Sequence, residues 1–136
     1  MSTSSIEFPL SPLRTRTGTI PEPIIPIRIY TPSGFKSFDF LVDSGADMSV
    51  LPKAMASILR INLQHCPTTT TQGVEGYGAK IFRARIVIQL GAWTDTIRCA
   101  FVGHDAIPPL LGRVDVFSRY NITFHARRHS IFFERI

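Results

Sequence analysis

The sequence predicts a mainly β protein with a single folded domain, and three observations lead to this prediction. Most of the chain consists of short runs of β-branched and aromatic residues that are separated by Gly, Pro, Asn or Asp, as strands and turns are. Residues 80–90 alternate between apolar and polar side chains, which indicates a strand with one buried face. Only two short segments have helical features. A chain of 136 residues is long enough for one core of modest size.

The first 22 residues are rich in Ser, Thr and Pro, so we expect a flexible head followed by a folded domain of residues 23–136. In that domain the expected strands are the runs PIIPIRIYT, FKSFDFLV, SVLP, AKIFRARIVIQL, TDTIRCAFVG, NITFHA and HSIFFERI. The step at residues 91–93 predicts a hairpin turn, and the last two runs predict a second hairpin. Short helices are expected at residues 52–59, with Pro in the first turn, and at residues 113–118.

The composition excludes two classes of protein. Hydrophobic residues make up 44% of the chain and charged residues 18%, which is unlike a disordered polymer. No apolar run approaches the roughly 20 residues that a membrane-spanning helix needs, so no membrane segment is expected. The first residues also lack the basic start and apolar run of a secretory signal, and we therefore expect a cytoplasmic protein.

The residues that commonly bind metals or act as nucleophiles show no characteristic spacing. Cys66 and Cys99 are far apart in the sequence and predict two reduced thiols, not a zinc site or a disulfide framework. No Ser or Cys has the local setting of an activated nucleophile. We therefore expect neither a metal nor a cofactor. The histidines, which form no ligand spacing, are His65, His104, His125 and His129.

The chain is basic, with a formal net charge of +5. Such a charge could favour an acidic partner, including nucleic acid. The arginines are scattered along the chain, however, and the one dense run, HARRH at residues 125–129, lies between two apolar runs and suits the solvated turn of a hairpin. We expect no nucleic-acid partner.

Two motifs suggest chemistry. The stretch FDFLVDSGADMSVLP, residues 38–52, places an Asp-Ser-Gly-Ala-Asp run between two strand-like segments. Since Asp, Ser and Gly are common in turns, a purely structural turn is one interpretation. The second motif is AIPPLLGRVDVFSRYNITF at residues 106–124, in which two leucines lead into Gly and Arg.

The order of these motifs and the intervening strands resembles the retropepsin-like aspartic peptidases, the single-lobed homodimeric relatives of pepsin. The resemblance covers about residues 24–136. It implies a closed, barrel-like acid-protease fold with one lobe per chain and one or two short helices.

The resemblance assigns roles to the first motif. Asp43 takes the position of the catalytic aspartate, within the motif of Asp43, Ser44 and Gly45. Ser44 matches the hydroxyl residue that bonds to the partner's backbone across the dimer. Ala46 and Asp47 complete the motif, and the second aspartate is implied to help bind the substrate main chain.

The second motif is implied to support the first. Leu110, Leu111 and Gly112 match the hydrophobic-hydrophobic-Gly motif of the family, and Arg113 follows it. The resemblance implies an ion pair between Arg113 and Asp47.

A glycine-rich segment, TTTTQGVEGYGAK, occupies the position of the flap that closes over substrate in the family. Gly73, Val74, Glu75 and Gly76 lie near its tip and are implied to contact substrate. Glycines suit a tip that turns tightly and moves. Glu75 departs from the viral pattern, which tends to have another Gly. An ordinary exposed hairpin loop is the alternative.

The chemistry explains why such a chain would dimerise. Peptide hydrolysis by carboxylates needs one group to activate water and another to protonate the carbonyl oxygen, and two adjacent aspartates achieve this by sharing a proton. This chain has one Asp-Ser-Gly motif, so a second copy must supply the other carboxylate, and twofold symmetry places Asp43 opposite its equivalent.

The leading hypothesis is thus an aspartic endopeptidase that hydrolyses peptide or protein substrates as a homodimer. The alternative is a catalytically inactive retropepsin-like module for dimerisation or peptide binding. Asp105 and Asp115 lack a matching Gly turn and are poor catalytic candidates.

Overall fold

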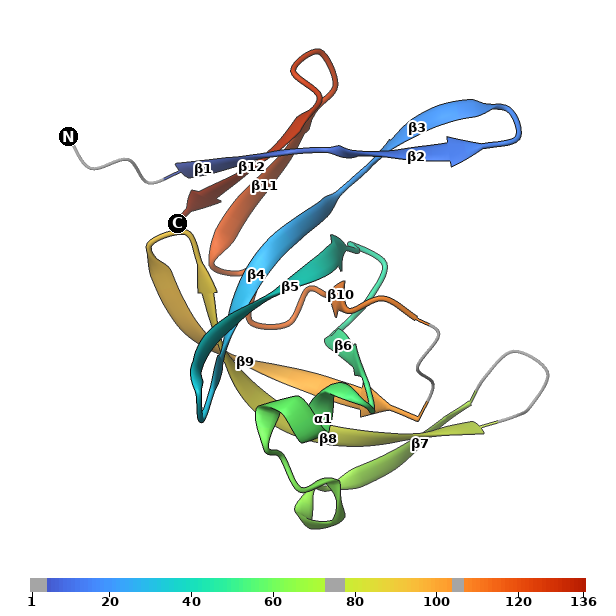
Figure 1. Cartoon of the computed structure of the whole chain (residues 1–136), viewed down its shortest axis with the longest axis vertical. Helices are drawn as coiled ribbons and strands as arrows, with labels where there is room; N and C mark the ends of the chain where they lie inside the picture. The colour runs from blue at the N-terminus through green and yellow to red at the C-terminus, as the bar shows by residue number, and fades with distance from the viewer. Residues whose placement is uncertain (1–4, 73–77, 104–106) are drawn as a thin grey trace.

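The computed structural model describes residues 5–72, 78–103 and 107–136, and it confirms a mainly β protein (Figure 1). Two short helical segments, α1 (Met55–Leu59) and the 3-10 helix η1 (Leu63–His65), lie between the strands. The strands are β1 (Ser5–Pro9), β2 (Ser11–Thr15), β3 (Gly18–Glu22), β4 (Ile24–Thr31), β5 (Gly34–Val42), β6 (Ser49–Pro52), β7 (Thr68–Gln72), β8 (Gly78–Leu90), β9 (Trp93–Val102), β10 (Leu110–Leu111), β11 (Tyr120–His125) and β12 (Ser130–Arg135).

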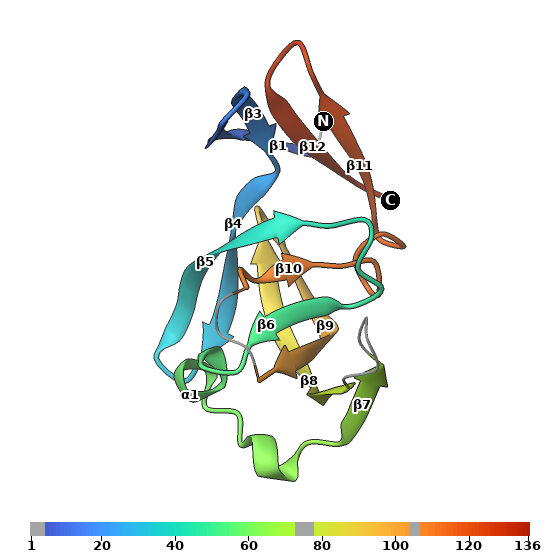
Figure 2. The ribbon, with the colours of Figure 1, turned by 90° about the vertical axis from the view of Figure 1, so that its right-hand side faces the viewer.

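The main sheet closes on itself. Its strands are paired in the order β4-β5-β10-β6-β9-β8-β7, and β8 also pairs with β4 through Arg28 opposite Gln89 and Ile29 opposite Ile88. The pairing of β4 with β8 closes the sheet into a barrel, and β7 is an additional strand on the edge of β8 (Figure 2). The barrel and the single lobe agree with the fold that the sequence predicts.

Alternating side chains of the barrel strands form the core. In β4, Ile25, Ile27 and Ile29 are fully buried, and the residues between them are exposed. In β8, Ile86, Ile88 and Leu90 are buried, which confirms the face predicted from the alternation of residues 80–90. The period-two pattern therefore correctly identifies which face of these strands packs inward.

The N-terminal residues differ from the flexible head expected from their composition. β1 pairs antiparallel with β12, and β2 and β3 form a hairpin of their own (Figure 1). Phe8 is buried, and its ring meets that of Phe133 edge to face at 5.9 Å. A strand of five residues that ends in Pro shows too few alternations for sequence analysis to separate it from a Pro-rich loop.

The C-terminal hairpin is present as predicted. β11 and β12 pair from Tyr120 opposite Arg135 to His125 opposite Ser130. Arg135 links this hairpin to the barrel, because its guanidinium donates two hydrogen bonds, of 2.6 and 2.9 Å, to the Asp95 carboxylate on β9. The three-stranded sheet β1-β12-β11 is thus fixed against the barrel by a partly buried ion pair as well as by apolar packing.

The helix predictions are only partly confirmed. α1 lies within the predicted residues 52–59, although Pro52 ends β6. Residues 113–118 form successive turns where a helix was expected, with hydrogen bonds from the N–H of Phe117 to the Arg113 carbonyl and from the N–H of Tyr120 to the Val116 carbonyl. Asp115 has a φ of 65°, and a left-handed residue at this position interrupts a right-handed helix.

The turn between β8 and β9 agrees with the predicted hairpin, and Gly91 has the positive φ of 60° that the turn requires. Within the described residues, no helix is long and apolar enough to cross a bilayer.

Candidate active site

The two motifs identified in the sequence meet at the end of β5. β10 runs parallel to β5, with Leu110 beside Leu41 and Leu111 beside Val42. Asp43 follows β5 directly, and its backbone N–H donates a 2.9 Å hydrogen bond to the Leu111 carbonyl. Figure 2 shows β5, β10 and β6 side by side. The strand pairing therefore fixes the backbone of Asp43 against the second motif.

The Asp-Ser-Gly segment forms a tight turn around the Asp43 carboxylate. Oδ1 of Asp43 accepts a 2.9 Å hydrogen bond from the N–H of Gly45, and the Asp43 carbonyl accepts one of 3.2 Å from the N–H of Ala46. A Cβ on Gly45 would lie 3.2 Å from Asp43 Oδ1, which is a tight contact. Asp43 is half-buried, whereas Ser44 and Gly45 are exposed. A glycine here lets the backbone amide approach the carboxylate closely.

Gly112 packs directly against the start of β6. Its N–H donates a 3.0 Å hydrogen bond to the hydroxyl of Ser49, which is fully buried. A Cβ on Gly112 would overlap the Met48 backbone and lie 2.8 Å from the Ser49 nitrogen. Sequence analysis did not identify Ser49, although a lone Ser in an otherwise apolar strand could have indicated a buried hydroxyl with a specific partner.

Asp47 and Arg113 form an ion pair between the two motifs. Their backbones are joined as well, because the N–H of Arg113 donates to the Ala46 carbonyl at 3.0 Å and the N–H of Val114 donates to the Asp47 carbonyl at 2.8 Å. The side chain of Asp47 remains 85% exposed. Its carboxylate is therefore oriented by Arg113 and still accessible to another molecule.

A second ion pair extends this arrangement to β9. The Asp115 carboxylate accepts hydrogen bonds of 2.9 Å from the backbone N–H, the Nε and the Nη2 of Arg98. These bonds lower the pKa of Asp115 to about 2. Asp115 therefore has a structural role in the fold, and its carboxylate already has partners for both oxygens.

The predicted residues Asp43, Ser44, Gly45, Ala46 and Asp47 thus lie beside Leu110, Leu111, Gly112 and Arg113. Their roles in catalysis and substrate binding stay predictions. The flap residues Gly73, Val74, Glu75 and Gly76 and the candidate Asp105 lie outside the described residues. The strands that flank the flap segment, β7 and β8, pair antiparallel up to Gln72 opposite Gly78.

The residues that could bind a metal or act as nucleophiles have been located as well. The parts of the chain that the structure describes contain no group of three or more His, Cys, Asp or Glu side chains that could hold a metal ion. Cys66 and Cys99 are free thiols, and burial raises the pKa of Cys99 to about 12, which disfavours the nucleophilic thiolate.

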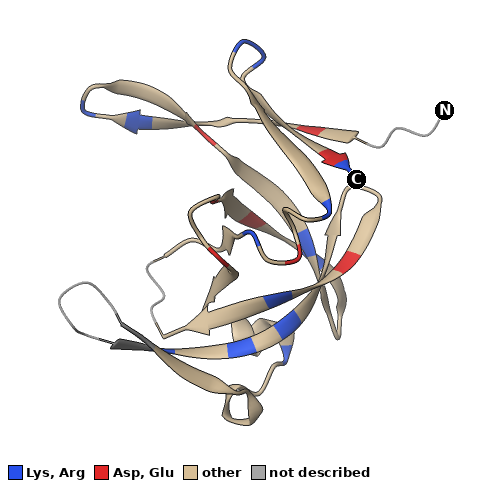
Figure 3. Cartoon of the chain, turned by 180° about the vertical axis from the view of Figure 1, so that it is seen from behind, with Lys and Arg blue, Asp and Glu red and all other residues tan. Residues whose placement is uncertain are grey.

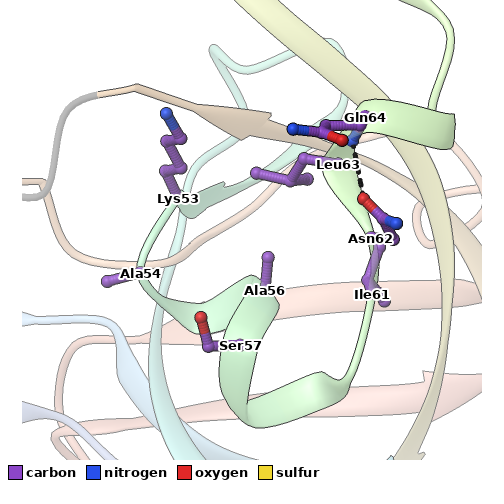
Figure 4. A pocket seen from close by; sticks show the side chains of 8 residues that line it. All are labelled: Lys53, Ala54, Ala56, Ser57, Ile61, Asn62, Leu63 and Gln64. Atoms are coloured by element: carbon purple, nitrogen blue, oxygen red, sulfur yellow. Dashed lines mark hydrogen bonds between the residues drawn. The ribbon is translucent and has the colours of Figure 1, made fainter.

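A hollow of about 540 Å³ lies between α1 and η1 (Figure 4). It contains a local hydrogen bond of 3.0 Å from the N–H of Gln64 to Asn62 Oδ1, which caps η1. None of the described residues that line it is among residues 43–47 or 110–113 of the candidate active site. The lining residues are Lys53, Ala54, Ala56, Ser57, Ile61, Asn62, Leu63 and Gln64.

Comparison with known families identifies the chain. Residues 26–113, which are more than half of the sequence, match the aspartyl protease family. The chain belongs to this family. The matched segment of this aspartyl protease family member begins in β4 and ends at Arg113, so it includes residues 43–47 and 110–113 of the candidate active site. No curated protein matches the chain.

Solved structures show that the fold is retropepsin-like. A retropepsin-like aspartic protease from Rickettsia conorii is 20% identical with a TM-score of 0.68, covering 98% of this chain and 94% of its own. The retroviral protease-like domain of Ddi1 from Leishmania major is 16% identical with a TM-score of 0.59, covering 85% and 94%. EIAV protease, solved with the inhibitor HBY-793, is 24% identical with a TM-score of 0.52, covering 68% and 82%.

Proposed function

We propose that this chain is an aspartic endopeptidase that hydrolyses peptide bonds as a homodimer. The observation that carries this proposal is the position of Asp43. Its backbone N–H donates a hydrogen bond to the Leu111 carbonyl, and its carboxylate accepts one from the N–H of Gly45. The Ser44 hydroxyl and the Asp47–Arg113 ion pair, which a catalytically inactive descendant could lose, are also present. Membership of the aspartyl protease family supports the same activity.

In this proposal the two copies of Asp43 face each other across a twofold axis. One carboxylate, ionised, removes a proton from water, and the other, protonated, donates its proton to the carbonyl oxygen of the scissile peptide. Neither copy alone can carry out both steps. The exposed hydroxyl of Ser44 lies next to Asp43, where it would bond to the partner's backbone and hold the two motifs together.

The substrate would be an extended peptide that lies between the aspartates and the flap. Asp47, oriented by Arg113 and largely exposed, would accept hydrogen bonds from the peptide's backbone N–H groups. Such main-chain recognition suits an endopeptidase, because it does not depend on one particular side chain at the cleavage site.

The first test is cleavage of a denatured protein mixture by the wild type and by Asp43→Asn, from mildly acidic to neutral pH. We expect the substitution to lower the rate at least about 100-fold, because it removes both the base and the acid. A statine-type transition-state mimic should block the wild type. The dimer content of each sample is measured by analytical ultracentrifugation.

A mixing experiment tests the shared mechanism. When wild type is equilibrated with a ninefold excess of Asp43→Asn, nearly all wild-type chains enter mixed dimers with one carboxylate. The wild-type activity should then fall to about one tenth, in proportion to the remaining wild-type dimers. Equal inactivity of wild type and Asp43→Asn, both folded and dimeric, would instead favour an inactive module for dimerisation or peptide binding.

A further inference from the structure

A second hollow, of about 430 Å³, lies beside the candidate active site. Met48 lines it and directly follows Asp47 in the sequence. The parallel pairing of β6 with β9 sets Ser49 beside Cys99, so Met48 lies next to Arg98. We call this feature the basic hollow, and its lining residues are Met48, Pro67, Arg83, Ala84, Arg85, Arg98 and Cys99.

The basic hollow contains more positive charge than the described residues neutralise. Arg83 and Arg85 are exposed on β8, and Arg85 lies directly opposite Arg98 on β9. Basic segments of these two strands lie close together in Figure 3. Asp115 pairs with Arg98, but no described carboxylate forms an ion pair with Arg83 or Arg85.

Arg85 lies directly opposite Arg98, and like charges in such a pair repel each other. Asp115 offsets the charge of Arg98, so Arg83 and Arg85 provide the charge that is available to a ligand. The strands hold these side chains in place. Three hydrogen bonds to Asp115 fix Arg98, and the backbone N–H of Arg83 donates a 2.9 Å hydrogen bond to the Pro67 carbonyl. The guanidinium groups are therefore carried on paired strands, which positions them for an anionic partner.

We propose that the basic hollow binds an acidic side chain of the substrate peptide, at a position several residues from the scissile bond. This inference rests on the proposed function. A peptide whose main chain reaches Asp47 continues past Met48 toward Arg83, Arg85 and Arg98. Guanidinium groups bind carboxylates through paired hydrogen bonds, so Asp or Glu at this position gains affinity.

The lining of the basic hollow favours a peptide over nucleic acid. Proteins that bind single-stranded nucleic acid combine basic grooves with aromatic side chains on which bases stack. None of the described residues that line the basic hollow is aromatic. The hollow offers charge recognition beside a peptide-binding aspartate, without a stacking platform.

The deciding experiment measures binding in the Asp43→Asn background, where cleavage does not occur. A peptide pool from a digested proteome is passed over the immobilised protein, and the retained peptides are identified by mass spectrometry. We expect Asp and Glu to be enriched about two- to fivefold over the input, as exposed ionic contacts allow. The substitutions Arg83→Gln and Arg85→Gln together should remove this enrichment.

The matched control carries Arg14→Gln and Arg16→Gln, which remove the same charge from exposed positions on the β2–β3 hairpin. This control should retain the enrichment. Loss of enrichment in the control as well would overturn the proposal, because net charge alone would then explain the binding. Absence of enrichment in the background protein would overturn it too, as would displacement of the peptides by a thymidine oligonucleotide at lower concentrations than by a polyglutamate peptide.

Cleavage by the wild type tests the proposed function independently of the binding experiment. If the wild type cleaves nothing while the binding result holds, the peptidase proposal fails and the binding proposal stands. If cleavage occurs, Asp and Glu should be enriched at one position at least two residues from the scissile bond. The Arg83→Gln and Arg85→Gln pair should lose that preference and retain cleavage of neutral peptides.

Discussion

The buried hydroxyl of Ser49 accepts a 3.0 Å hydrogen bond from the backbone N–H of Gly112. This bond joins the first residue of β6 to the turn that follows β10, and β10 in turn bonds to the backbone of Asp43. The position of the candidate catalytic aspartate thus depends on a hydroxyl that contacts no substrate.

Replacing Ser49 by Ala should lower the free energy of unfolding by about 1–3 kcal/mol, because the Gly112 N–H would be left buried without an acceptor. Urea denaturation measures the change. Ser57→Ala is the control, since Ser57 is exposed on α1 and its removal should cost less than about 0.5 kcal/mol. Equal stability of the Ser49 variant and wild type would mean that this hydrogen bond contributes nothing to the fold.

Gly112→Ala should destabilise the protein by at least about 1–3 kcal/mol, because the added Cβ overlaps the Met48 backbone and forces the two motifs apart. Peptidase activity should fall with it. Gly103→Ala is a matched control, because a Cβ at Gly103 meets nothing within 4 Å. Thermal unfolding of the two variants gives the comparison, and similar melting temperatures would contradict the close packing at Gly112.

Asp47→Asn should separate stability from activity. Both members of the Asp47–Arg113 ion pair are more than half exposed, so its loss should change the free energy of unfolding by less than about 1 kcal/mol. The KM for peptides should nevertheless rise if Asp47 binds the substrate main chain. Asp39→Asn removes the same charge from an exposed position on β5 and should leave KM unchanged. A large loss of stability in Asp47→Asn would show that the ion pair is mainly structural.

Asp115 should contribute to stability in a defined range of pH. Its pKa falls from the ordinary 3.8 to about 2 in the fold, chiefly through the side-chain hydrogen bonds with Arg98. The stabilisation is therefore complete above pH 3.8 and is lost as the pH falls through about 2. Asp115→Asn should cost about 1 kcal/mol at neutral pH, discounted because Arg98 is partly exposed.

Urea denaturation at neutral pH, at pH 4 and near pH 2 should show the difference between Asp115→Asn and wild type shrinking toward the acidic end. Asp39→Asn again serves as the control. A difference that stays constant with pH would show that the pKa of Asp115 is not lowered by folding.

Local patterns explain why part of this structure could be predicted. The alternation in β8 correctly identifies its buried face, and the resemblance of the two motifs to retropepsin-like sequences correctly places Arg113 against Asp47. The turns at residues 113–118 could not be predicted in this way, because the left-handed conformation of Asp115 accompanies bonds to Arg98 on a distant strand. β1 could not be predicted for a similar reason, because its partner β12 lies at the other end of the chain.

Phe8 provides a direct test of that N-terminal strand. Its side chain is 8% exposed and packs edge to face against Phe133, so Phe8→Ala should lower the free energy of unfolding by about 3–5 kcal/mol. Leu13→Ala on the neighbouring hairpin is the control, because Leu13 is 38% exposed and should cost much less. If both substitutions had the same small effect, residues 5–22 would not contribute to the fold and would behave as the flexible head that their composition suggests.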